Sequence, residues 1–232
     1  DKVGCIPGIL NLWFDQRVEY KNEMKKYGKA GNKEKYAFFH KRQLVQKILL
    51  NSLYGVLGLP AFRFYDVDNA TAVTTTGQTV IKSTADMANI KYNKELGDPD
   101  LDSNIYIDTD SVFFSAVPLM DKRTPNWKDE DQDTIAGYVN DIAEEMQDYL
   151  NDFYDIMSTK IFNVDKENHR LEIKKEYVAK AGLWIAKKRY AQWIISDNGV
   201  PCDKLDVKGL DVKRSSFPKA HQECMGKVLI DI

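Results

Sequence analysis

Several features that mark other classes of protein are absent from this sequence. No apolar run approaches the roughly 20 residues of a membrane-spanning helix, and Asp1-Lys2-Val3 does not open a secretory signal peptide. The sequence has no internal repeats and no low-complexity tract, which excludes repeat and collagen-like proteins. We therefore expect a soluble, cytoplasmic, globular protein with no membrane partner.

Cysteine is scarce. Cys5, Cys202 and Cys224 are odd in number and far apart, which fits free thiols in a reducing compartment better than a disulfide framework. His221 and Cys224 could share one helix face, but a zinc site needs about four ligands and no second pair is near. We interpret both as ordinary helix side chains.

The charges nearly cancel, because 33 Lys and Arg residues face 35 Asp and Glu residues. With a formal net charge of −2, any surface that binds nucleic acid would have to be a local patch. The overall charge therefore neither supports nor excludes such a function.

Large apolar side chains, by contrast, are plentiful. The chain has 232 residues, 43% of them hydrophobic, including 10 Phe, 12 Tyr and 4 Trp. At about 150 residues per domain, this length predicts one or two domains with a buried core. The sequence starts without Met and ends at residues 227–232 in what resembles the middle of an element, so we expect a piece of a longer chain.

Apolar residues at helical spacing predict a pair of helices near the start of the chain, over residues 9–27 and 34–57. The breakers in residues 28–33 separate them and predict a helical hairpin. The arms carry many cations, which an ordinary pair of solvated helices would also explain. Further helices are predicted over residues 69–92, 134–157 and from Pro218 onward.

Extended segments are predicted between these helices. The expected elements are a short extended piece at 62–65, a β-hairpin over 105–117, a surface loop at 121–133, two or three strands within 170–195, and a strand over 204–212 after an Asn198-Gly199 turn. Together the two kinds of element predict an α+β fold.

The second helix has a distinct polar side. Leu44, Ile48 and Leu49 are expected to hold this helix to its neighbours, which leaves the polar side free to line a groove. Arg17 and Lys21, four residues apart on the first helix, are expected to meet it across the hairpin. Converging cations suit a polyphosphate. On a helix that advances about 100° per residue, four side chains share an arc of about 80°: Gln43, Lys47, Asn51 and Tyr54.

Two aspartates interrupt the predicted β-hairpin. Asp108 and Asp110 are two residues apart, so in an extended segment they project to the same side. Like charges so placed repel unless a cation lies between them, and Mg²⁺ takes one or two carboxylates together with phosphate oxygens. The alternative is an Asp-rich turn whose side chains bond to their own backbone.

Two basic clusters follow. Lys187-Lys188-Arg189-Tyr190 lies between apolar flanks, and strand alternation would put Lys188 with Tyr190 on one face and Lys187 with Arg189 on the other. Such a strand suits a phosphate backbone, although an exposed edge strand explains it nearly as well. Before the last helix, Lys213-Arg214-Ser215-Ser216 is also suited to phosphate contact.

The order of these clusters and their residue patterns resemble the sequence motifs of family B DNA polymerases. Residues 47–55 resemble the fingers-to-palm motif K-x-x-x-N-S-x-Y-G, residues 106–111 the palm motif Y-x-D-T-D-S, and residues 187–190 the later K-K-R-Y segment. Softer similarities to the bacteriophage branch include Gly4-Cys5-Ile6-Pro7 and Phe14-Asp15-Gln16-Arg17. The resemblance thus covers nearly the whole chain.

The resemblance implies a role for each cluster. Arg17, Lys21 and Lys47 would hold the triphosphate of a dNTP, with Gln43 and Asn51 lining that face and Tyr54 at the nascent base pair. Asp110 would be the main carboxylate bridging two Mg²⁺ ions, and Asp108 a weaker partner. Lys188 and Tyr190 would grip the primer near its 3′ end. The expected contacts with primer-template DNA are Gly55, Lys187, Lys188, Arg189, Tyr190, Lys213, Ser215 and Ser216.

The implied organisation is a helical fingers hairpin with part of the N-terminal palm edge at 1–58, a palm with an antiparallel sheet and packed helices at 59–207, and the truncated start of a thumb at 208–232. The implied activity is template-directed nucleotidyl transfer in viral DNA replication, within an infected host cytoplasm. A sliding clamp is a further candidate partner.

The sequence also departs from the family. No D-x-x-S-L-Y-P-S motif, which holds the other palm carboxylate, occurs in residues 1–232, and the exonuclease domain and most of the thumb are missing. Asp66 and Asp68 match that carboxylate only in type, and we expect them to hold a local turn. This fragment alone is therefore expected to be inactive. The alternative function is a non-catalytic primer-template-binding module, or a subunit of a split polymerase.

Overall fold

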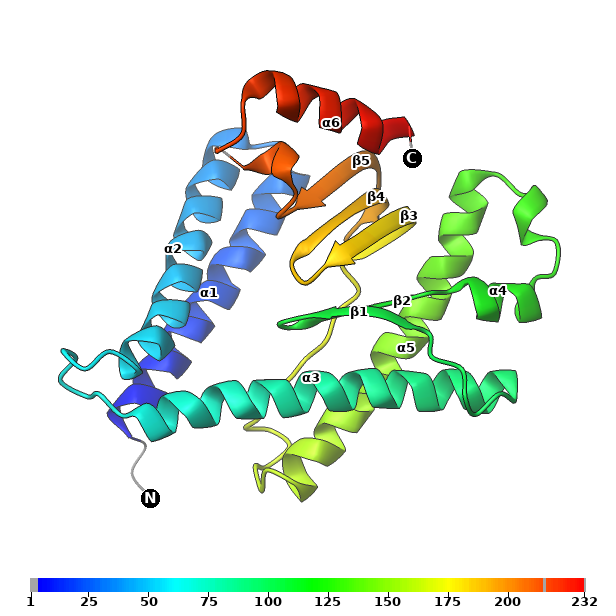
Figure 1. Ribbon diagram of the computed structural model, residues 1–232. Coiled ribbons are helices and arrows are strands. Elements are labelled where there is room, and N and C mark those ends of the chain that lie inside the picture. Colours follow the sequence, from blue (N-terminus) through cyan, green and yellow to red (C-terminus); the bar gives the residue numbers. More distant parts are fainter. Residues whose placement is uncertain (1–3, 215, 232) are drawn as a thin grey trace. The chain divides into compact units, whose positions relative to one another are not determined.

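Two long antiparallel helices, α1 (Cys5–Lys29) and α2 (Lys33–Leu57), open the computed structural model, which describes residues 4–214 and 216–231 (Figure 1). Gly31 makes the turn between them with a φ of 68°, and the Asn32 side chain caps α2 by accepting the Lys35 N–H. The predicted helical hairpin is confirmed. It belongs to the first of two compact units, residues 1–77 and 78–232.

The apolar side of α2 predicted to pack is not the side that packs. Leu44, Ile48 and Leu49 are 43%, 56% and 37% exposed. The side chains at positions 46, 50 and 53, spaced four and three residues apart, are instead half-buried, and Gln46 Nε2 donates to Gln16 Oε1 of α1 at 2.8 Å. Periodicity identifies the faces of a helix, but α2 has apolar residues on more than one face. The spacing alone therefore did not determine which face packs against α1.

Residues 58–66 were predicted to contain a short extended piece, and this prediction is wrong. The Phe62 N–H donates to the Leu59 carbonyl and the Tyr65 N–H to the Phe62 carbonyl, so the chain makes successive turns. Asp66 then accepts the Asn69 N–H at 3.0 Å at the start of α3 (Val67–Leu96). Asp66 therefore holds a local turn, as predicted.

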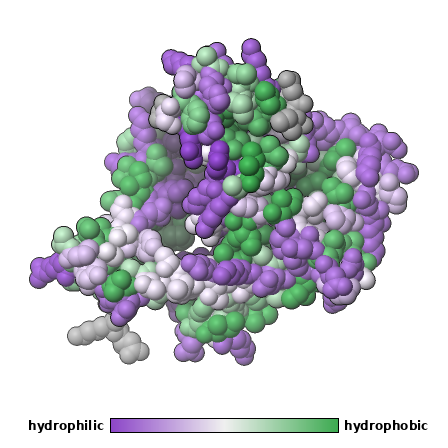
Figure 2. Space-filling view, viewed as in Figure 1, coloured by the Kyte–Doolittle hydropathy of each residue, from purple (hydrophilic) through white to green (hydrophobic). Residues whose placement is uncertain are grey.

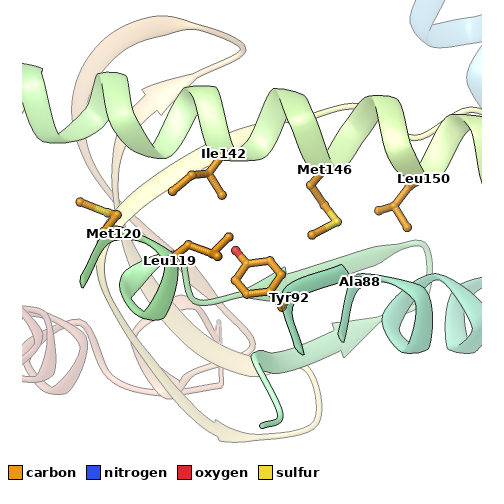
Figure 3. Packing of buried hydrophobic residues seen from close by; sticks show 7 residues of the cluster. All are labelled: Ala88, Tyr92, Leu119, Met120, Ile142, Met146 and Leu150. Carbon is orange, nitrogen blue, oxygen red and sulfur yellow. The ribbon is translucent and has the colours of Figure 1, made fainter. Parts of the chain in front are cut away.

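The main core of the second unit lies between α3, α4 (Val117–Arg123) and α5 (Gln132–Lys160). Figure 3 shows seven of its side chains converging from these helices: Ala88, Tyr92, Leu119, Met120, Ile142, Met146 and Leu150. The amphipathic α5 is confirmed. Residues 121–133 are not a plain loop, because they include the end of α4 and the short helix η1 (Trp127–Asp129), and burial of Leu119 and Met120 holds α4 in place.

The strands form two separate antiparallel sheets. β1 (Asn104–Asp108) pairs with β2 (Ser111–Phe114), while β3 (Tyr177–Ala186), β4 (Arg189–Asp197) and β5 (Val200–Lys208) form a meander. Asn198 and Gly199, with φ of 50° and 79°, make the predicted turn. After β5 come η2 (Asp211–Lys213) and α6 (Lys219–Asp231). The α+β fold is confirmed.

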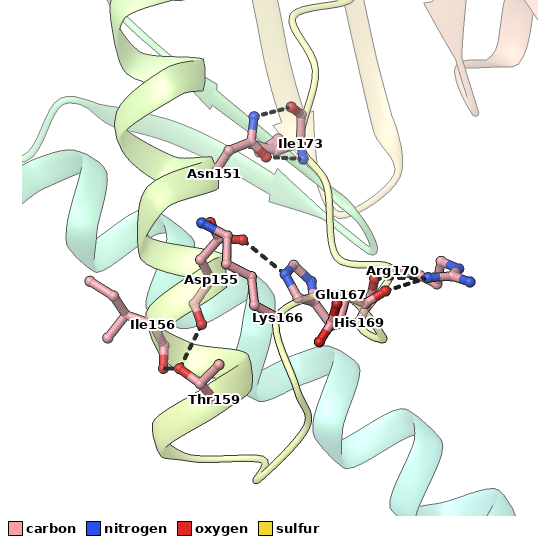
Figure 4. A network of polar contacts seen from close by, with 9 residues as sticks. All are labelled: Asn151, Asp155, Ile156, Thr159, Lys166, Glu167, His169, Arg170 and Ile173. Carbon is pink, nitrogen blue, oxygen red and sulfur yellow. Dashed lines mark hydrogen bonds and ion pairs between the residues drawn. The ribbon is translucent and has the colours of Figure 1, made fainter.

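A segment without regular structure connects α5 to β3 and is held by side chains of α5. The Asn151 amide accepts the Ile173 N–H and donates to the Ile173 carbonyl, at 2.9 and 3.0 Å (Figure 4). Farther along α5, Asp155 contacts both His169 and Lys166. Lys166 first, and His169 second, lower the pKa of Asp155. This network fixes where β3 begins.

Among the described residues, no helix has the length and hydropathy needed to cross a membrane. The surface nevertheless carries apolar residues, and Figure 2 shows them interspersed with hydrophilic ones on the viewed face. Phe64 of the first unit and Ile185 of the second are 52% and 59% exposed. Single exposed apolar side chains of this kind are normal on protein surfaces.

Candidate active site

The two predicted carboxylates lie at the turn between β1 and β2. Thr109 has a φ of 54°, and the Asp110 N–H donates to the Asp108 carbonyl at 2.6 Å, which makes a three-residue turn. The expectation that both aspartates share one face of an extended segment is wrong, because the strand ends at Asp108. The Asp108 side chain is only 20% exposed, whereas Asp110 lies outside the strand and is exposed.

Helix α3 fixes the start of this hairpin. The Ser103 N–H donates to Asn89 Oδ1 at 3.0 Å, and the Asn104 side chain donates to the Ala85 carbonyl at 3.0 Å. At the other strand, the Phe114 ring packs edge-on against Tyr92, with 5.6 Å between centroids. The acidic turn is therefore the exposed end of a hairpin whose base is anchored to the core.

Lys187 and Lys188 do not lie on a strand, contrary to the sequence prediction. They form the turn between β3 and β4, with Lys188 at a φ of 59°, so strand alternation does not sort their side chains. The Lys188 N–H donates to the Tyr106 hydroxyl at 2.7 Å. Its ammonium lies 3.9 Å from Asp108 Oδ1, a distant ion pair. The basic turn is thus adjacent to the acidic one.

A cluster of aromatic rings packs between the β1–β2 hairpin and the β3–β4 hairpin, next to these two turns. The Tyr190 ring lies 5.4 Å from Tyr106 and 5.7 Å from Phe113, and Phe113 also packs against Trp184. Tyr190 is 6% exposed, and burial first, then the nearby Asp108 carboxylate, raises its pKa. In this arrangement Tyr190 supports the two turns from within the fold, and its buried side chain does not fit the predicted grip on the primer.

Gly209 is a position that the sequence reasoning missed. It has a φ of 62°, and a Cβ there would overlap the Lys188 carbonyl oxygen. Arg189, predicted to contact DNA, is meanwhile 3.3 Å from Asp211 across the same junction. A single glycine after a strand gave no signal of this role, because the close approach arises only once β5 returns beside β4.

Replacing Gly209 is expected to destabilise the basic turn. Gly209→Ala should lower the free energy of unfolding by about 1–3 kcal/mol, because it combines a left-handed φ with a backbone overlap. The matched control is Gly199→Ala, where φ is also positive but the space is open. Thermal unfolding of both variants in the complete protein measures the difference. Equal losses would show that the close approach contributes nothing.

The remaining predicted DNA contacts lie on several elements. Lys187, Lys213 and Ser216 are exposed, and Ser215 lies outside the described residues. Gly55 is within α2, where a Cβ would meet no atom within 4 Å in the described chain. Lys187, Lys213, Ser216 and Gly55 are open to a ligand, whereas Arg189 is already engaged by Asp211.

The predicted triphosphate residues lie in the first unit. Lys47, Asn51 and Tyr54 are exposed on α2, and Gln43 is half-buried. Lys21 is exposed on α1, while Arg17 is half-buried, with its Nε enclosed and lacking a hydrogen-bond partner among the described residues. The contact between Gln16 and Gln46 places Arg17 level with the part of α2 that carries Gln43 and Lys47. The hairpin thus brings Arg17 to the level of Lys47, while Lys21 lies farther along, near where Tyr20 of α1 meets Arg42 of α2.

The acidic turn offers two ligands to a metal ion. Mg²⁺ is bound in proteins through one or two carboxylates, with phosphate oxygens and water completing the set. Asp108 and Asp110 match that requirement in chemistry and spacing along the chain. Within residues 4–214 and 216–231, no group of three or more His, Cys, Asp or Glu could hold a metal. The residues present therefore fit as part of a ligand set.

Comparison with known proteins agrees with the motifs. The family model of DNA polymerase family B matches residues 1–125, which include both the α2 motif and the acidic turn. The chain is 32% identical to the DNA-directed DNA polymerase of Escherichia phage RB69 over 202 residues, 81% of this chain and 22% of that protein. It is 31% identical to the DNA-directed DNA polymerase of Enterobacteria phage T4, over 79% of this chain and 21% of that protein.

The similarity extends beyond phages. A DNA polymerase of Thermococcus gorgonarius is 28% identical over 229 residues, 99% of this chain and 24% of that protein. The chain therefore spans between a fifth and a quarter of the length of these relatives. With more than half of its length matched by the family model, and a phage relative above 30% identity, the chain belongs to DNA polymerase family B, in its bacteriophage type.

Proposed function

We propose that this chain is the fingers hairpin (1–58), the palm (59–207) and the start of the thumb (208–232) of a polymerase that extends a primer on a DNA template during viral replication. The observation that carries the proposal is the adjacency of the two turns, with Lys188 beside Asp108 and its N–H bonded to Tyr106. A phosphate-binding cation next to paired carboxylates is what nucleotidyl transfer requires.

The two aspartates differ in a way that assigns them different roles. Asp108 Oδ1 accepts the Thr109 hydroxyl and faces the Lys188 ammonium, so part of its coordination capacity is already used. Asp110 is exposed, and no contact of its carboxylate is recorded among the described residues. We assign Asp110 as the main metal ligand and Asp108 as the weaker one. Two bound Mg²⁺ ions would stabilise charge on the attacking and leaving oxygens.

The basic turn is suited to the primer backbone. The Lys188 side chain is 65% exposed and its ion pair with Asp108 is long, so a phosphate can replace that pair at little cost. The backbone of Lys188 is fixed by Tyr106, which leaves the side chain free to reach a phosphate. Lys187 would add a second contact, with Lys213, Ser215 and Ser216 at more distant phosphates.

The first unit is assigned to the incoming dNTP. Arg17, Lys21 and Lys47 would bind its triphosphate, since guanidinium and ammonium groups are the strongest partners of phosphate. Gln43 and Asn51 would line the same side. Tyr54 would pack at the nascent base pair, and the absence of a side chain at Gly55 would let the backbone approach the DNA.

A non-catalytic module that grips primer-template DNA is the second candidate. It is favoured by the lack, in the described residues, of a third carboxylate near the acidic turn. Primer extension by the complete protein, with Mg²⁺ and all four dNTPs, separates the two. Binding of primer-template without any extension would support the module and reject the enzyme.

The contact between Lys188 and the primer is testable by salt titration. Lys188→Ala in the complete polymerase should weaken primer-template binding and flatten the dependence of log K on log salt by up to about one unit, because one fewer phosphate contact releases one fewer counterion. The turn should persist, since the bond to Tyr106 uses the backbone N–H. Lys204→Ala, at an exposed lysine of β5, is the matched control. If affinity and slope both stay unchanged, Lys188 is not at the interface.

A further inference from the structure

The distal end of the α1–α2 hairpin is strongly basic in a chain that is otherwise acidic. Residues 22–42 contain seven Lys or Arg and two Glu, whereas the rest of the chain has 26 against 33. The residues proposed to bind the triphosphate lie outside this segment. The proposed function gives no role to the charged side chains within it. We call five of its cations the tip patch: Lys25, Lys26, Lys29, Lys33 and Lys35.

Cations of both helices converge within the tip patch. The ammonium groups of Lys26 from α1 and Lys35 from α2 lie 5.5 and 4.8 Å from the centroid of the same ring, Tyr27. Lys25, Lys26 and Lys29 also line one shallow depression on α1. All five side chains are exposed, and the one ion pair recorded among them in the described residues joins Lys26 to Glu23 at 3.3 Å.

Helix stability accounts for Lys26 and Lys29, which lie in the last turn of α1 where the helix dipole favours cations, but not for the rest of this charge. Lys33 and Lys35 occupy the first turn of α2, where the helix dipole favours anions and a cation is unfavourable. Their repulsion with the lysines at the end of α1 adds to this cost. A surface that accumulates cations against the local electrostatics is adapted to an external polyanion.

Exposed aromatic rings accompany the cations. Tyr36 is 41% exposed and Phe38 50% exposed, both on α2 directly after the tip patch. The Arg42 guanidinium lies 4.7 Å from the centroid of the Phe38 ring. Cations that track a backbone, together with rings on which bases stack, are how proteins bind single-stranded nucleic acid without sequence preference. An acidic protein partner would use the cations but would not need the rings.

We propose that the tip patch, with Tyr36 and Phe38, is a second nucleic-acid site that binds single-stranded DNA. Its lysines contact the phosphates and the two rings stack on bases. The site needs neither the acidic turn nor a bound dNTP. It shares with the proposed function only the premise that the complete protein handles DNA.

The test is binding of a fluorescent oligothymidylate to the complete polymerase, followed by anisotropy without Mg²⁺ or dNTP. The triple variant Lys26→Glu, Lys29→Glu, Lys33→Glu should bind at least tenfold more weakly, and its salt slope should fall by about two units, at about 0.7 per phosphate contact on a single strand. A matched triple variant, Lys82→Glu, Lys94→Glu, Lys160→Glu, changes the same net charge at exposed lysines of α3 and α5 and should have a much smaller effect.

A second pair of measurements identifies the ligand class. Tyr36→Ala with Phe38→Ala should weaken oligothymidylate binding while leaving heparin, a polyanion without bases, unaffected. Unchanged oligothymidylate affinity in the lysine variant would overturn the site. Loss of heparin and oligothymidylate binding in the lysine variant, with no effect of the aromatic variant, would overturn single-stranded DNA as the ligand and indicate an acidic protein surface.

Controls separate this site from folding and from the proposed activity. The triple Glu variant should unfold at a temperature close to that of the wild type, because Lys33→Glu favours the start of α2 whereas Lys26→Glu and Lys29→Glu disfavour the end of α1. If it unfolds earlier, the milder triple variant Lys26→Gln, Lys29→Gln, Lys33→Gln decides, and normal binding by a folded Gln variant would overturn the proposal. Primer extension at saturating primer-template should persist in the Glu variant. Failure of the wild-type protein to extend would reject the polymerase activity without affecting this binding test.

Discussion

Asp110→Ala in the complete polymerase is expected to lower the rate of nucleotide incorporation by several orders of magnitude while leaving primer-template affinity largely intact. Asp110 is exposed at the end of the β1–β2 turn, where its carboxylate is available to a metal ion. Its contribution would therefore be made to the transition state and not to the binding of DNA. Single-turnover incorporation, measured beside DNA affinity, separates the two quantities.

Asp108→Ala should have a smaller effect, since its carboxylate is shared with Thr109 and Lys188. Removing it should also free the Lys188 ammonium, so DNA affinity should not fall. Asp100→Ala, an exposed carboxylate in the loop before β1, is the control for loss of charge and should incorporate at the normal rate. Equal damage from Asp108→Ala and Asp110→Ala, or a near-normal rate in Asp110→Ala, would contradict the assignment of the main ligand.

The second large effect concerns the chain by itself. Residues 1–232, purified and supplied with primer-template, Mg²⁺ and all four dNTPs, should give no detectable extension. The acidic turn supplies only two carboxylates, and no third ligand group accompanies them in the described residues. Without an opposing carboxylate, two metals about 4 Å apart cannot be fixed. Positioning supplies most of the rate in phosphoryl transfer, so its loss should abolish turnover.

Robust extension by this chain would show that a carboxylate within it completes the site. Asp66 and Asp68 would be the first to replace by alanine. The structure already weighs against Asp66, because its two oxygens accept the backbone and side-chain N–H groups of Asn69 at 3.0 and 2.7 Å. The positive control is the complete polymerase under identical conditions.

Local sequence determined most of the secondary structure correctly. The helical hairpin, α3, α5, the β1–β2 hairpin and the Asn198-Gly199 turn all depend on interactions between near neighbours, namely helical periodicity, caps and turn residues. The short α4 was missed because its stability depends on burying Leu119 and Met120 against α3 and α5, which no local pattern reveals.

The errors at the site have a similar origin. Lys188 adopts a left-handed φ that is uncommon for a side chain other than glycine, and its turn contains no Gly or Asn. What stabilises the turn is the bond from its N–H to Tyr106, 82 residues earlier, and the close approach of Gly209. The sequence predicts candidate side chains by type, but the backbone that presents them is fixed by contacts distant along the chain.

The two hydrogen bonds between the Asn151 side chain and the Ile173 backbone determine where mutations should be tolerated. One amide satisfies both backbone groups of Ile173, a pairing that otherwise requires a neighbouring strand (Figure 4). An aspartate at this position could accept the Ile173 N–H but could not donate to the Ile173 carbonyl, and a leucine could form neither hydrogen bond. Position 151 should therefore accept almost no substitute. Glu172 and Lys174 are exposed residues of the connecting segment that form a surface ion pair with each other, a contact of little energetic value, so both should vary freely. Natural selection for the conformation of the segment between α5 and β3 would thus act on Asn151, a residue of helix α5.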